Sequence, residues 1–427
     1  MQKKSTILGG LLGNLRGSAT ITSGGLLLLA NVIVVLLGLI RTPLVTWVLP
    51  KDEVGMIGVV AAWFPFVQLL SLTGLDTAAY HYSSKGQPGA FRVNLQYRLR
   101  WSLLSALAFL LGAVYWYTRG DQLLFWMFII AGITFPLTAG LSACVGFLSA
   151  EQRFSSLFWY RIFESLTDFS GFIPLIFSTW AVSKVITFYG TNQLATMLMQ
   201  VGVTLAILQY FRQAKTSQLP PSERTDMVRY GKHLTGISVV SVVHTRIDAF
   251  YVGMFLPLQT MADYSIALIL YEQLKKLWII YTTIRYPELV NIQVMHRHRR
   301  FISEGSLVWT AFIMIGFAVV FLAFWLVPVL LPPVYISSLV YISILTAAFV
   351  IGLPGNIAEL FFRTCQDEKR QYMLRMLAAI AAVLGPLLLV NQFGGPGIAL
   401  GRLVSNLVLS LAGLILFLNA KNKELPG

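Results

Sequence analysis

The stretch from Gly231 to Leu289 decides how this sequence folds, and residues 244–289 of it read HTRIDAFYVGMFLPLQTMADYSIALILYEQLKKLWIIYTTIRYPEL. Since a membrane span needs about 20 mostly apolar residues, the stretch predicts two spanning helices joined by a short turn around Pro257. A charge at the centre of a bilayer costs about 2.5–3.5 kcal/mol even on the lenient insertion scale. We therefore expect the charged side chains of this stretch to pack against protein or to face a water-filled cavity. They include Arg246, Asp248, Asp263, Glu272, Lys275, Lys276 and Arg285.

The composition of the whole chain indicates a membrane protein. Of its 427 residues, 56% are hydrophobic and 12% are charged, and the mean hydropathy is +0.71. Soluble domains carry about 25% charged residues. About twelve apolar stretches are long enough to span a bilayer. The sequence therefore predicts an all-α integral membrane protein with about twelve transmembrane helices.

The formal net charge of +14 is explained by the distribution of Lys and Arg among the loops. If the N-terminus lies inside the cell, the outside turns hold only Lys51, Arg119 and Lys184, and the other loop cations lie inside. This asymmetry follows the positive-inside rule, so we expect both termini to be cytoplasmic. No nucleic acid is needed to explain the charge, and none is expected as a partner.

No motif of enzyme chemistry stands out. The two cysteines, Cys144 and Cys365, lie in or beside apolar stretches and indicate neither a disulfide framework nor a metal site. Glycine-rich segments lie in membrane stretches, where small residues permit close helix packing. We therefore expect no enzyme activity, no cofactor and no metal.

The longest polar stretch divides the chain into two halves. It reads RQAKTSQLPPSERTDMVRYGK, and its Ser, Pro and charged residues are typical of a linker. We predict an N-terminal lobe of six spans over 1–215, a cytoplasmic linker over 216–232, and a C-terminal lobe of six spans over 233–427.

The two halves resemble each other in sequence. Arg41 and Arg246 each lie late in the first span of a half, and each is followed by a proline turn, at Pro50 or Pro257, and the next span. Two six-span halves that both begin inside are related by an axis along the membrane normal. Parallel repeats of this kind occur in transporters, with substrate sites between the halves.

Two segments also carry a family resemblance. LPKDEVGMIGVVAAWFPFVQLLSLTGLDTAAYHY (49–82) and VRYGKHLTGISVVSVVHTRIDAFYVGMFLPLQTMADYSIALILYEQLKK (228–276) resemble the polysaccharide transport (Wzx-type) flippases. These belong to the multidrug/oligosaccharidyl-lipid/polysaccharide exporter superfamily, which also contains the lipid II flippase and the multidrug and toxin extrusion pumps. The chain departs from the family pattern at 262–264, where Ala-Asp-Tyr replaces a Gly-Leu-Tyr-like triplet.

The resemblance implies two pseudo-symmetric six-helix lobes around a central cavity, in the bacterial inner membrane. It implies that the protein flips undecaprenyl-pyrophosphate-linked oligosaccharide from the cytoplasmic to the outer leaflet by alternating access. The expected partners are this lipid-linked substrate and membrane lipids, with other polysaccharide-assembly membrane proteins as candidates.

A pyrophosphate substrate requires fixed positive charge in the cavity, which Arg supplies as a bidentate fork and Lys as a point charge. The candidate substrate-binding residues are Arg41, Arg246, Lys275 and Lys276. Because adjacent helical residues project about 100° apart, at most one of the two lysines need point into the cavity. In the alternative reading, Glu272 neutralises both lysines locally.

Candidate coupling or gating residues are the remaining charges of the spans. His244 and Asp248 share a helix face at i, i+4 and could respond to protons, but we favour an interhelical hydrogen bond for His244 and a cation on another helix for Asp248. Asp248 and Arg246 lie about 200° apart and cannot pair. Arg161, Glu164 and Asp168 share one face and could bind a coupling cation, form gate salt bridges, or pair locally. Asp76, Glu272 and Glu359, the last with Arg363 at i+4, complete the set.

Two other function classes compete with the flippase. A cation-coupled exporter of organic cations needs acidic cavity residues, and the excess of Arg and Lys in the membrane argues against it. A polysaccharide ligase or polymerase usually needs a sizeable extramembrane segment, and every predicted outside turn is short.

Overall fold

The structure is a computed structural model of the whole chain, and it describes residues 5–177, 183–213, 219–290, 294–365 and 367–420. Within these residues every regular element is a helix. The elements are α1 (Ser5–Val48), α2 (Lys51–Leu69), α3 (Gly74–Ser84), α4 (Ala90–Thr118), α5 (Gln122–Thr138), η1 (Leu141–Ala143), α6 (Cys144–Ala150), α7 (Phe154–Thr167), α8 (Phe172–Phe177), α9 (Lys184–Gln213), α10 (Pro221–Phe255), α11 (Leu258–Val290), α12 (Val294–Leu330), η2 (Pro333–Tyr335), α13 (Ser338–Thr364), α14 (Glu368–Phe393) and α15 (Gly395–Ala420).

The all-α membrane fold is confirmed. In the described part of the chain, nine segments are long and apolar enough to cross a membrane. The predicted spans outside this set are the α7–α8 segment, α10 and α11. Charged side chains lower the hydropathy of α10 and α11, as the opening stretch of the sequence shows.

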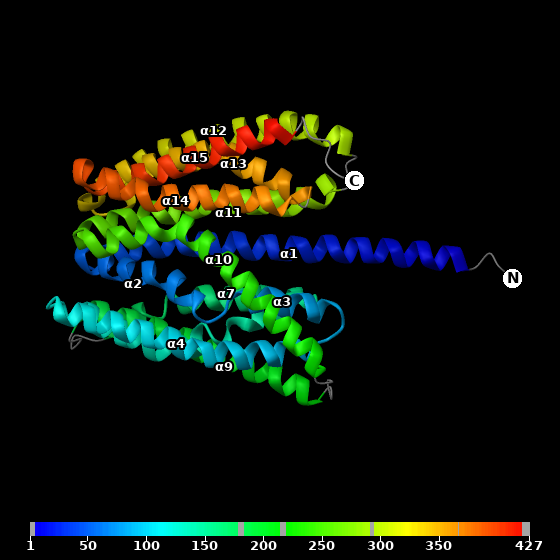
Figure 1. Cartoon of the computed structure of the whole chain (residues 1–427). Coiled ribbons are helices and arrows are strands. Elements are labelled where there is room, and N and C mark those ends of the chain that lie inside the picture. Colours follow the sequence, from blue (N-terminus) through cyan, green and yellow to red (C-terminus); the bar gives the residue numbers. More distant parts are fainter. Residues whose placement is uncertain (1–4, 178–182, 214–218, 291–293, 366, 421–427) are drawn as a thin grey trace. The chain divides into compact units, whose positions relative to one another are not determined.

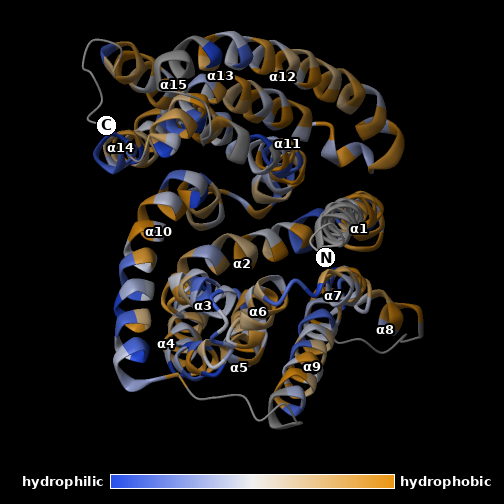
Figure 2. Cartoon of the chain, turned by 90° about the vertical axis from the view of Figure 1, so that its right-hand side faces the viewer, coloured by the Kyte–Doolittle hydropathy of each residue, from blue (hydrophilic) through white to orange (hydrophobic). Residues whose placement is uncertain are grey.

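Two predicted boundaries differ from the structure. The second span, predicted from about 54 to 80, is two helices, α2 and α3, because the chain breaks at Leu72, whose φ of 57° is left-handed. The predicted linker over 216–232 is partly helical, since α10 begins at Pro221, a residue suited to the first turn of a helix. Hydrophilic residues colour this first part of α10 blue in Figure 2.

The chain forms two compact units. Unit 1 comprises Met1–Thr42 and Val67–Gly236, and unit 2 comprises Pro43–Phe66 and Ile237–Gly427. These units group residues by contact. The lobes over 1–215 and 233–427 remain a prediction about which residues move together.

In unit 1, α4 and α5 pack against each other, α5 also packs on α9, and the shorter helix α3 packs on both α4 and α6. Phe109 of α4 contacts Phe128 and Phe135 of α5, with ring centroids 5.9 and 5.4 Å apart. The first part of α10 lies against α3, where the Gly74 N–H donates to Thr235 Oγ1 at 3.0 Å. The described residues of unit 1 include two clusters of buried apolar residues, one around Phe91 and Phe147 and one around Leu75 and Met227.

Unit 2 packs α13 and α14 against α15, beside α11 and α12 (Figure 1). Gly401 of α15 lies so close to Pro386 of α14 that any side chain there would collide with the α14 backbone. The segment 43–66 also belongs to this unit. Gly55 of α2 contacts the Leu258 carbonyl, where a Cβ would not fit, and Trp63 packs on Phe250 with ring centroids 5.4 Å apart.

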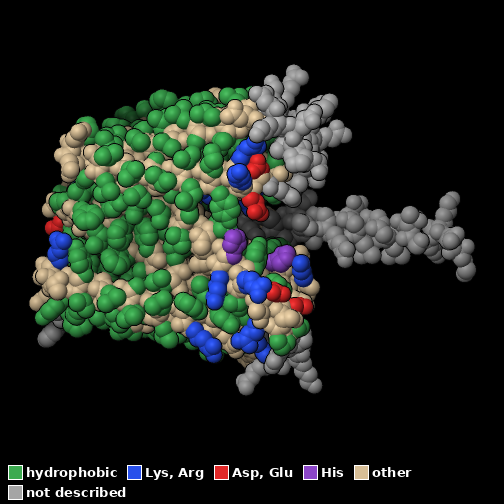
Figure 3. Space-filling model, in the orientation of Figure 1, with side chains coloured by type: hydrophobic (Ala, Val, Ile, Leu, Met, Phe, Trp, Pro, Cys, Tyr) green, Lys and Arg blue, Asp and Glu red, His purple; other side chains and the backbone are tan. Residues whose placement is uncertain are grey.

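The outer face of unit 2 is apolar. Figure 3 shows hydrophobic side chains over it, with Lys, Arg, Asp and Glu gathered toward one end. On α12 the side chains of Phe317, Phe321 and Trp325 are largely exposed. Exposed apolar surface of this extent marks an interaction face, and on a span of this length the natural contact is lipid.

Candidate functional site

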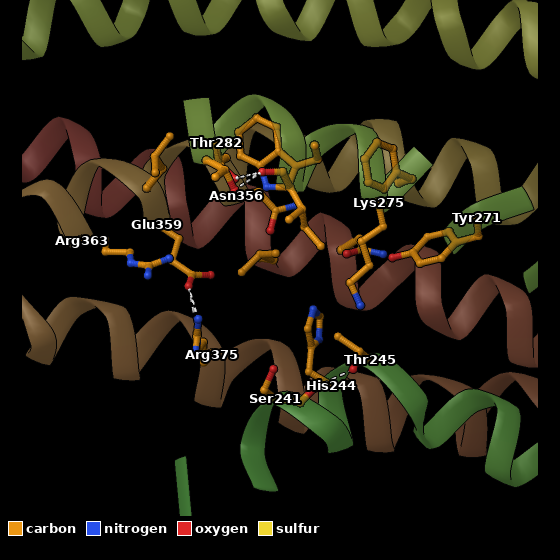
Figure 4. A pocket seen from close by; sticks show the side chains of 17 residues that line it. Ser241, His244, Thr245, Tyr271, Lys275, Thr282, Asn356, Glu359, Arg363 and Arg375 are labelled. Atoms are coloured by element: carbon orange, nitrogen blue, oxygen red, sulfur yellow. Dashed lines mark hydrogen bonds and ion pairs between the residues drawn. The ribbon is translucent and has the colours of Figure 1, made fainter. Parts of the chain in front are cut away.

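Unit 2 contains a cavity of about 350 Å³, shown in Figure 4. It lies among α10, α11, α13, α14 and α15. Its polar side chains come from helices that are far apart in the sequence, and they include residues from the stretch that opened the sequence analysis. Both His244 of α10 and Lys275 of α11 line it.

The cavity carries an excess of positive charge. Lys275, Arg363 and Arg375 line it, against the single carboxylate of Glu359. Arg375 donates from Nε and Nη2 to Glu359 Oε1, at 2.9 and 2.5 Å. The Arg363 guanidinium lies 5.1 Å from the Tyr286 ring centroid. Two of the three lining cations therefore make no ion pair with the lining carboxylate in the described residues.

The cations of the central stretch are arranged around Glu272. Arg246 Nη2 lies 3.0 Å from Glu272 Oε1, whereas Lys275 Nζ lies 3.9 Å from the same oxygen. The Glu272 carboxylate therefore pairs with two cations, and its contact with Arg246 is the shorter one. Lys276 is exposed and is not among the residues that line the cavity.

A buried ion pair lies one helical turn from the cavity. Asp248 of α10 accepts from Arg402 of α15 and from the Tyr264 hydroxyl, and both charged side chains are 4% exposed. Arg402 also donates to the Thr245 carbonyl at 3.0 Å and lies 4.2 Å from the Tyr271 ring centroid. Asp248 therefore pairs with a cation on another helix, and Arg246 points elsewhere.

His244 has the contacts of a packing residue. Its Nδ1 lies 3.2 Å from Ser405 Oγ of α15, and Ser405 Oγ also donates to the Ala378 carbonyl at 2.9 Å. These contacts join α10, α14 and α15. The interhelical hydrogen bond that the sequence analysis favoured is present, and a role in proton coupling stays a prediction.

In unit 1 the structure brings together two residues that the sequence had placed in different groups. Arg41 Nη1 lies 3.7 Å from Asp168 Oδ2, with side chains 30% and 50% exposed. The Arg41 guanidinium also lies 5.9 Å from the Phe188 ring centroid. Arg41 therefore has a carboxylate partner within its own unit.

The other acidic residues of unit 1 also have partners. Glu164 accepts from the Tyr160 hydroxyl at 3.3 Å, and Arg161 lies half-buried on the same helix, α7. Asp76 of α3 accepts from Arg98 Nη1 at 2.5 Å and from the Asn94 amide at 2.9 Å, both on α4. Their gating or coupling roles stay predictions.

Sequence reasoning missed two features. Glu359 pairs with Arg375 of α14 rather than with Arg363, its neighbour at i+4. Lys51, counted only as an outside-turn charge, donates to Asp263 Oδ2 at 2.8 Å, to the Val334 carbonyl at 2.6 Å and to Ser337 Oγ at 3.2 Å. No periodicity predicts either contact, because each joins separate helices. Among the described residues, no group of three His, Cys, Asp or Glu side chains could hold a metal ion.

Comparison with solved structures identifies the fold. An inward-facing multidrug resistance MATE family transporter of the MOP superfamily has a TM-score of 0.62 at 12% identity, covering 91% of this chain and 96% of its own. An outward-facing one has a TM-score of 0.56 at 12% identity, covering 94% of each chain. A MATE protein in the straight conformation has a TM-score of 0.56 at 13% identity, covering 94% of this chain and 97% of its own. At these identities the likeness shows the two-lobed fold alone.

Comparison with protein families is more specific. No curated protein matches the sequence. The profile of the family described as "Polysaccharide biosynthesis protein" matches residues 21–293, which is more than half of the chain and includes both segments that resemble Wzx-type flippases. The chain therefore belongs to the polysaccharide biosynthesis protein family.

Proposed function

We propose that this protein is a flippase for undecaprenyl-pyrophosphate-linked oligosaccharide, moving it from the cytoplasmic to the outer leaflet of the bacterial inner membrane. The family links the chain to polysaccharide synthesis, and the fold is that of a multi-pass transporter. The observation that carries the proposal is the cationic cavity of unit 2, where Lys275, Arg363 and Arg375 face one carboxylate.

The chemistry of the cavity suits a diphosphate. Phosphate oxygens accept charge-assisted hydrogen bonds, which are about twice as strong as neutral ones. Lys275 is a movable point charge, because its nearest carboxylate, Glu272, is 3.9 Å away and closer to Arg246. Uncompensated charge inside a membrane protein is costly and marks substrate pathways. A diphosphate in the cavity would supply the missing negative charge.

The transport step follows from the fold. Solved relatives of this fold include one inward-facing and one outward-facing structure, so we propose alternating access for this chain too. Arg41 and Arg246 remain proposed substrate contacts, and their carboxylates Asp168 and Glu272 are partners that a phosphate could replace. The positive-inside rule supports cytoplasmic termini. The polyprenyl tail would stay in the bilayer while the head group enters the cavity.

The organic-cation exporter is the second candidate, and the ion pairs of unit 1 weigh against it. Asp76 is held by Arg98 at 2.5 Å and Asp168 faces Arg41, so neither carboxylate is an open cation site. A ligase or polymerase has less support, because connections that we predict to lie outside, such as 119–121 and 256–257, are only a few residues long.

The proposal is tested by loss of transport. Lys275→Ala and Arg375→Ala, separately and together, are produced in a bacterium that lacks its own flippase. Surface polysaccharide is measured together with protein abundance in the membrane. Lys369→Ala is the matched control, because Lys369 is exposed on α14 and does not line the cavity.

We expect the double variant to abolish surface polysaccharide at normal abundance, and the control to match wild type. Translocation of lipid-linked sugar in inverted vesicles separates transport from assembly. Wild-type translocation by the double variant would overturn the cavity assignment, and translocation of an organic cation instead of the lipid-linked sugar would favour the exporter.

A further inference from the structure

The cavity of unit 2 is also lined by two carboxamides, Asn356 of α13 and Asn406 of α15. Asn406 is 5% exposed, and within the described residues neither amide side chain makes a hydrogen bond. A carboxamide has two N–H donors and an acceptor oxygen, and both amides line the cavity without using these groups in a bond to the described part of the protein. They are therefore available to a ligand.

The fold holds Asn406 in place. A Cβ at Gly352 would lie 2.7 Å from Asn406 Oδ1, so the glycine makes the room that lets this amide lie against α13. The preceding residue, Ser405, is fixed by its contacts to His244 and to the Ala378 carbonyl. Asn356 lies one helical turn after Gly352 on α13. The two amides are therefore positioned by neighbouring packing rather than by partners of their own.

The rest of this part of the cavity is neutral, polar and aromatic. The hydroxyls of Thr282 and Thr283 donate to the Ile279 carbonyl, at 2.9 and 2.8 Å, which leaves their lone pairs free to accept. Trp278 lines the cavity and stacks on Tyr281, with ring centroids 5.5 Å apart and planes at 27°. An indole face beside amides and hydroxyls offers an apolar platform and both kinds of hydrogen-bonding group.

These groups suit a sugar ring, which has hydroxyls at its edge and C–H groups on its faces. In Figure 4, Asn356 lies between Lys275 on one side and Glu359, Arg363 and Arg375 on the other. A neutral polar centre with cations beside it matches a hexose joined directly to a diphosphate. A volume of about 350 Å³ lies at the lower end of ligand pockets, which suits one sugar with its diphosphate and excludes a long oligosaccharide.

We propose that the unit 2 cavity contains a hexose subsite, in which Asn356 and Asn406 hydrogen-bond the sugar that is attached to the diphosphate. The inference rests on the proposed function, since the cations must bind the diphosphate for the sugar to reach the amides. In this proposal the cavity binds the sugar that is attached to the lipid diphosphate, and the more distant sugars of the oligosaccharide stay outside the cavity.

The test compares the affinity for lipid diphosphate with and without one sugar. The full-length protein in nanodiscs is titrated with undecaprenyl diphosphate and with its glucosyl, galactosyl, N-acetylglucosaminyl and N-acetylgalactosaminyl derivatives. The variants are Asn356→Ala, the double variant Asn356→Ala/Asn406→Ala, and, as a control, Asn391→Ala, whose amide is exposed on α14.

We expect at least one sugar to strengthen wild-type binding about tenfold, which corresponds to one or two net hydrogen bonds. The double variant should lose this preference while its affinity for undecaprenyl diphosphate stays within about twofold. Asn391→Ala should keep it. Asn356→Ala alone should lose part of it, and this variant decides the matter if the double variant does not fold.

Two results would overturn the subsite: no sugar strengthens binding to the wild type, or the variants keep the full preference. Failure of the proposed function looks different. In that case undecaprenyl diphosphate itself does not bind, or Lys275→Ala and Arg375→Ala bind it as the wild type does.

Discussion

Both units contain an Arg–Asp pair, and in unit 2 the pair lies beside a cationic cavity. In unit 1, Arg98 pairs with Asp76, and Arg41 with Asp168. In unit 2, Arg402 pairs with Asp248, while the cations beside it outnumber the cavity's one carboxylate. Charge inside a membrane protein is therefore not informative by itself. What distinguishes a candidate substrate site is charge that the protein leaves uncompensated beside an open volume.

The two buried pairs also differ in how well they are satisfied. Arg98 is fully buried, yet its Nε and Nη2 have no hydrogen-bond partner in the described residues, and Asp76 is 33% exposed. Arg402 has a carboxylate, a backbone carbonyl and an aromatic face, and its carboxylate is 4% exposed. Unit 2 thus depends on its pair more than unit 1 does.

The largest expected effect is that of Arg402→Met on stability. Removing one partner of a buried ion pair costs about 3–5 kcal/mol, because the other charge stays buried without compensation. Arg98→Met should cost clearly less, since Asp76 is partly exposed and keeps the Asn94 amide as a donor. Denaturant unfolding of the purified variants measures both free energies. An equal loss in the two variants would remove this difference between the units.

A second substitution in the same pair checks the cause. Replacing Asp248 as well, in Arg402→Met/Asp248→Leu, removes the uncompensated charge, and replacing a whole buried pair by apolar residues is often neutral or stabilising. We expect the double variant to be more stable than Arg402→Met alone. If it is less stable, the loss comes from packing rather than from charge.

The next effect concerns the contact of Lys51 in unit 2. Hydrogen bonds to charged groups contribute about 1.5–3 kcal/mol, and Lys51 makes one to a carboxylate that is 7% exposed. Lys51→Met should therefore destabilise unit 2 by an amount in this range, although Asp263 keeps its bond from Ser337 at 2.6 Å. Lys184→Met is the control, because Lys184 is an exposed residue of unit 1. If both variants unfold at the same denaturant concentration as the wild type, Lys51 is only a surface charge.

A smaller effect tests whether the cavity binds anions. Glu359→Gln releases Arg375 from its carboxylate, so affinity for inorganic pyrophosphate should rise about tenfold, equivalent to about 1.4 kcal/mol. Asp168→Asn in unit 1 frees Arg41 in the same way, but neither residue lines the unit 2 cavity, and we expect no change. Calorimetric titration of both variants measures the difference. A rise in Asp168→Asn alone would place the anion site in unit 1.

The sequence predicted the all-helical fold from hydrophobic length, and the relative direction of neighbouring side chains follows from helical periodicity. Lys275 lines the cavity and Lys276 does not, as adjacent residues about 100° apart require. The partners across helices could not be predicted in this way. Asp248 and Arg402 are 154 residues apart, and they meet only because α10 packs on α15.

Other features were missed because they carry no strong sequence signal. Asn356 and Asn406 are neutral residues within apolar runs, so a search for intramembrane charge passes over them. The break at Leu72 lies inside a stretch hydrophobic enough to be predicted as one span, and the left-handed backbone of Leu72 reveals it. The segment 43–66 precedes the mid-chain linker, yet its contacts are with unit 2, because close approach of Gly55 to Leu258 depends on packing rather than on order in the chain.

The smallest expected effect is that of the half-exposed pair in unit 1. Arg41 and Asp168 are 3.7 Å apart with side chains 30% and 50% exposed, and exposed pairs typically contribute about 0.2–1 kcal/mol. A double-mutant cycle of Arg41→Gln and Asp168→Asn on unfolding should give a coupling energy in this range. The same cycle for Arg402 and Asp248 should give a coupling several times larger, because water is excluded from that pair. If Arg41 and Asp168 proved to be coupled as strongly, unit 1 would hold a structural ion pair of the same kind, and Arg41 would lose its place among the proposed substrate contacts.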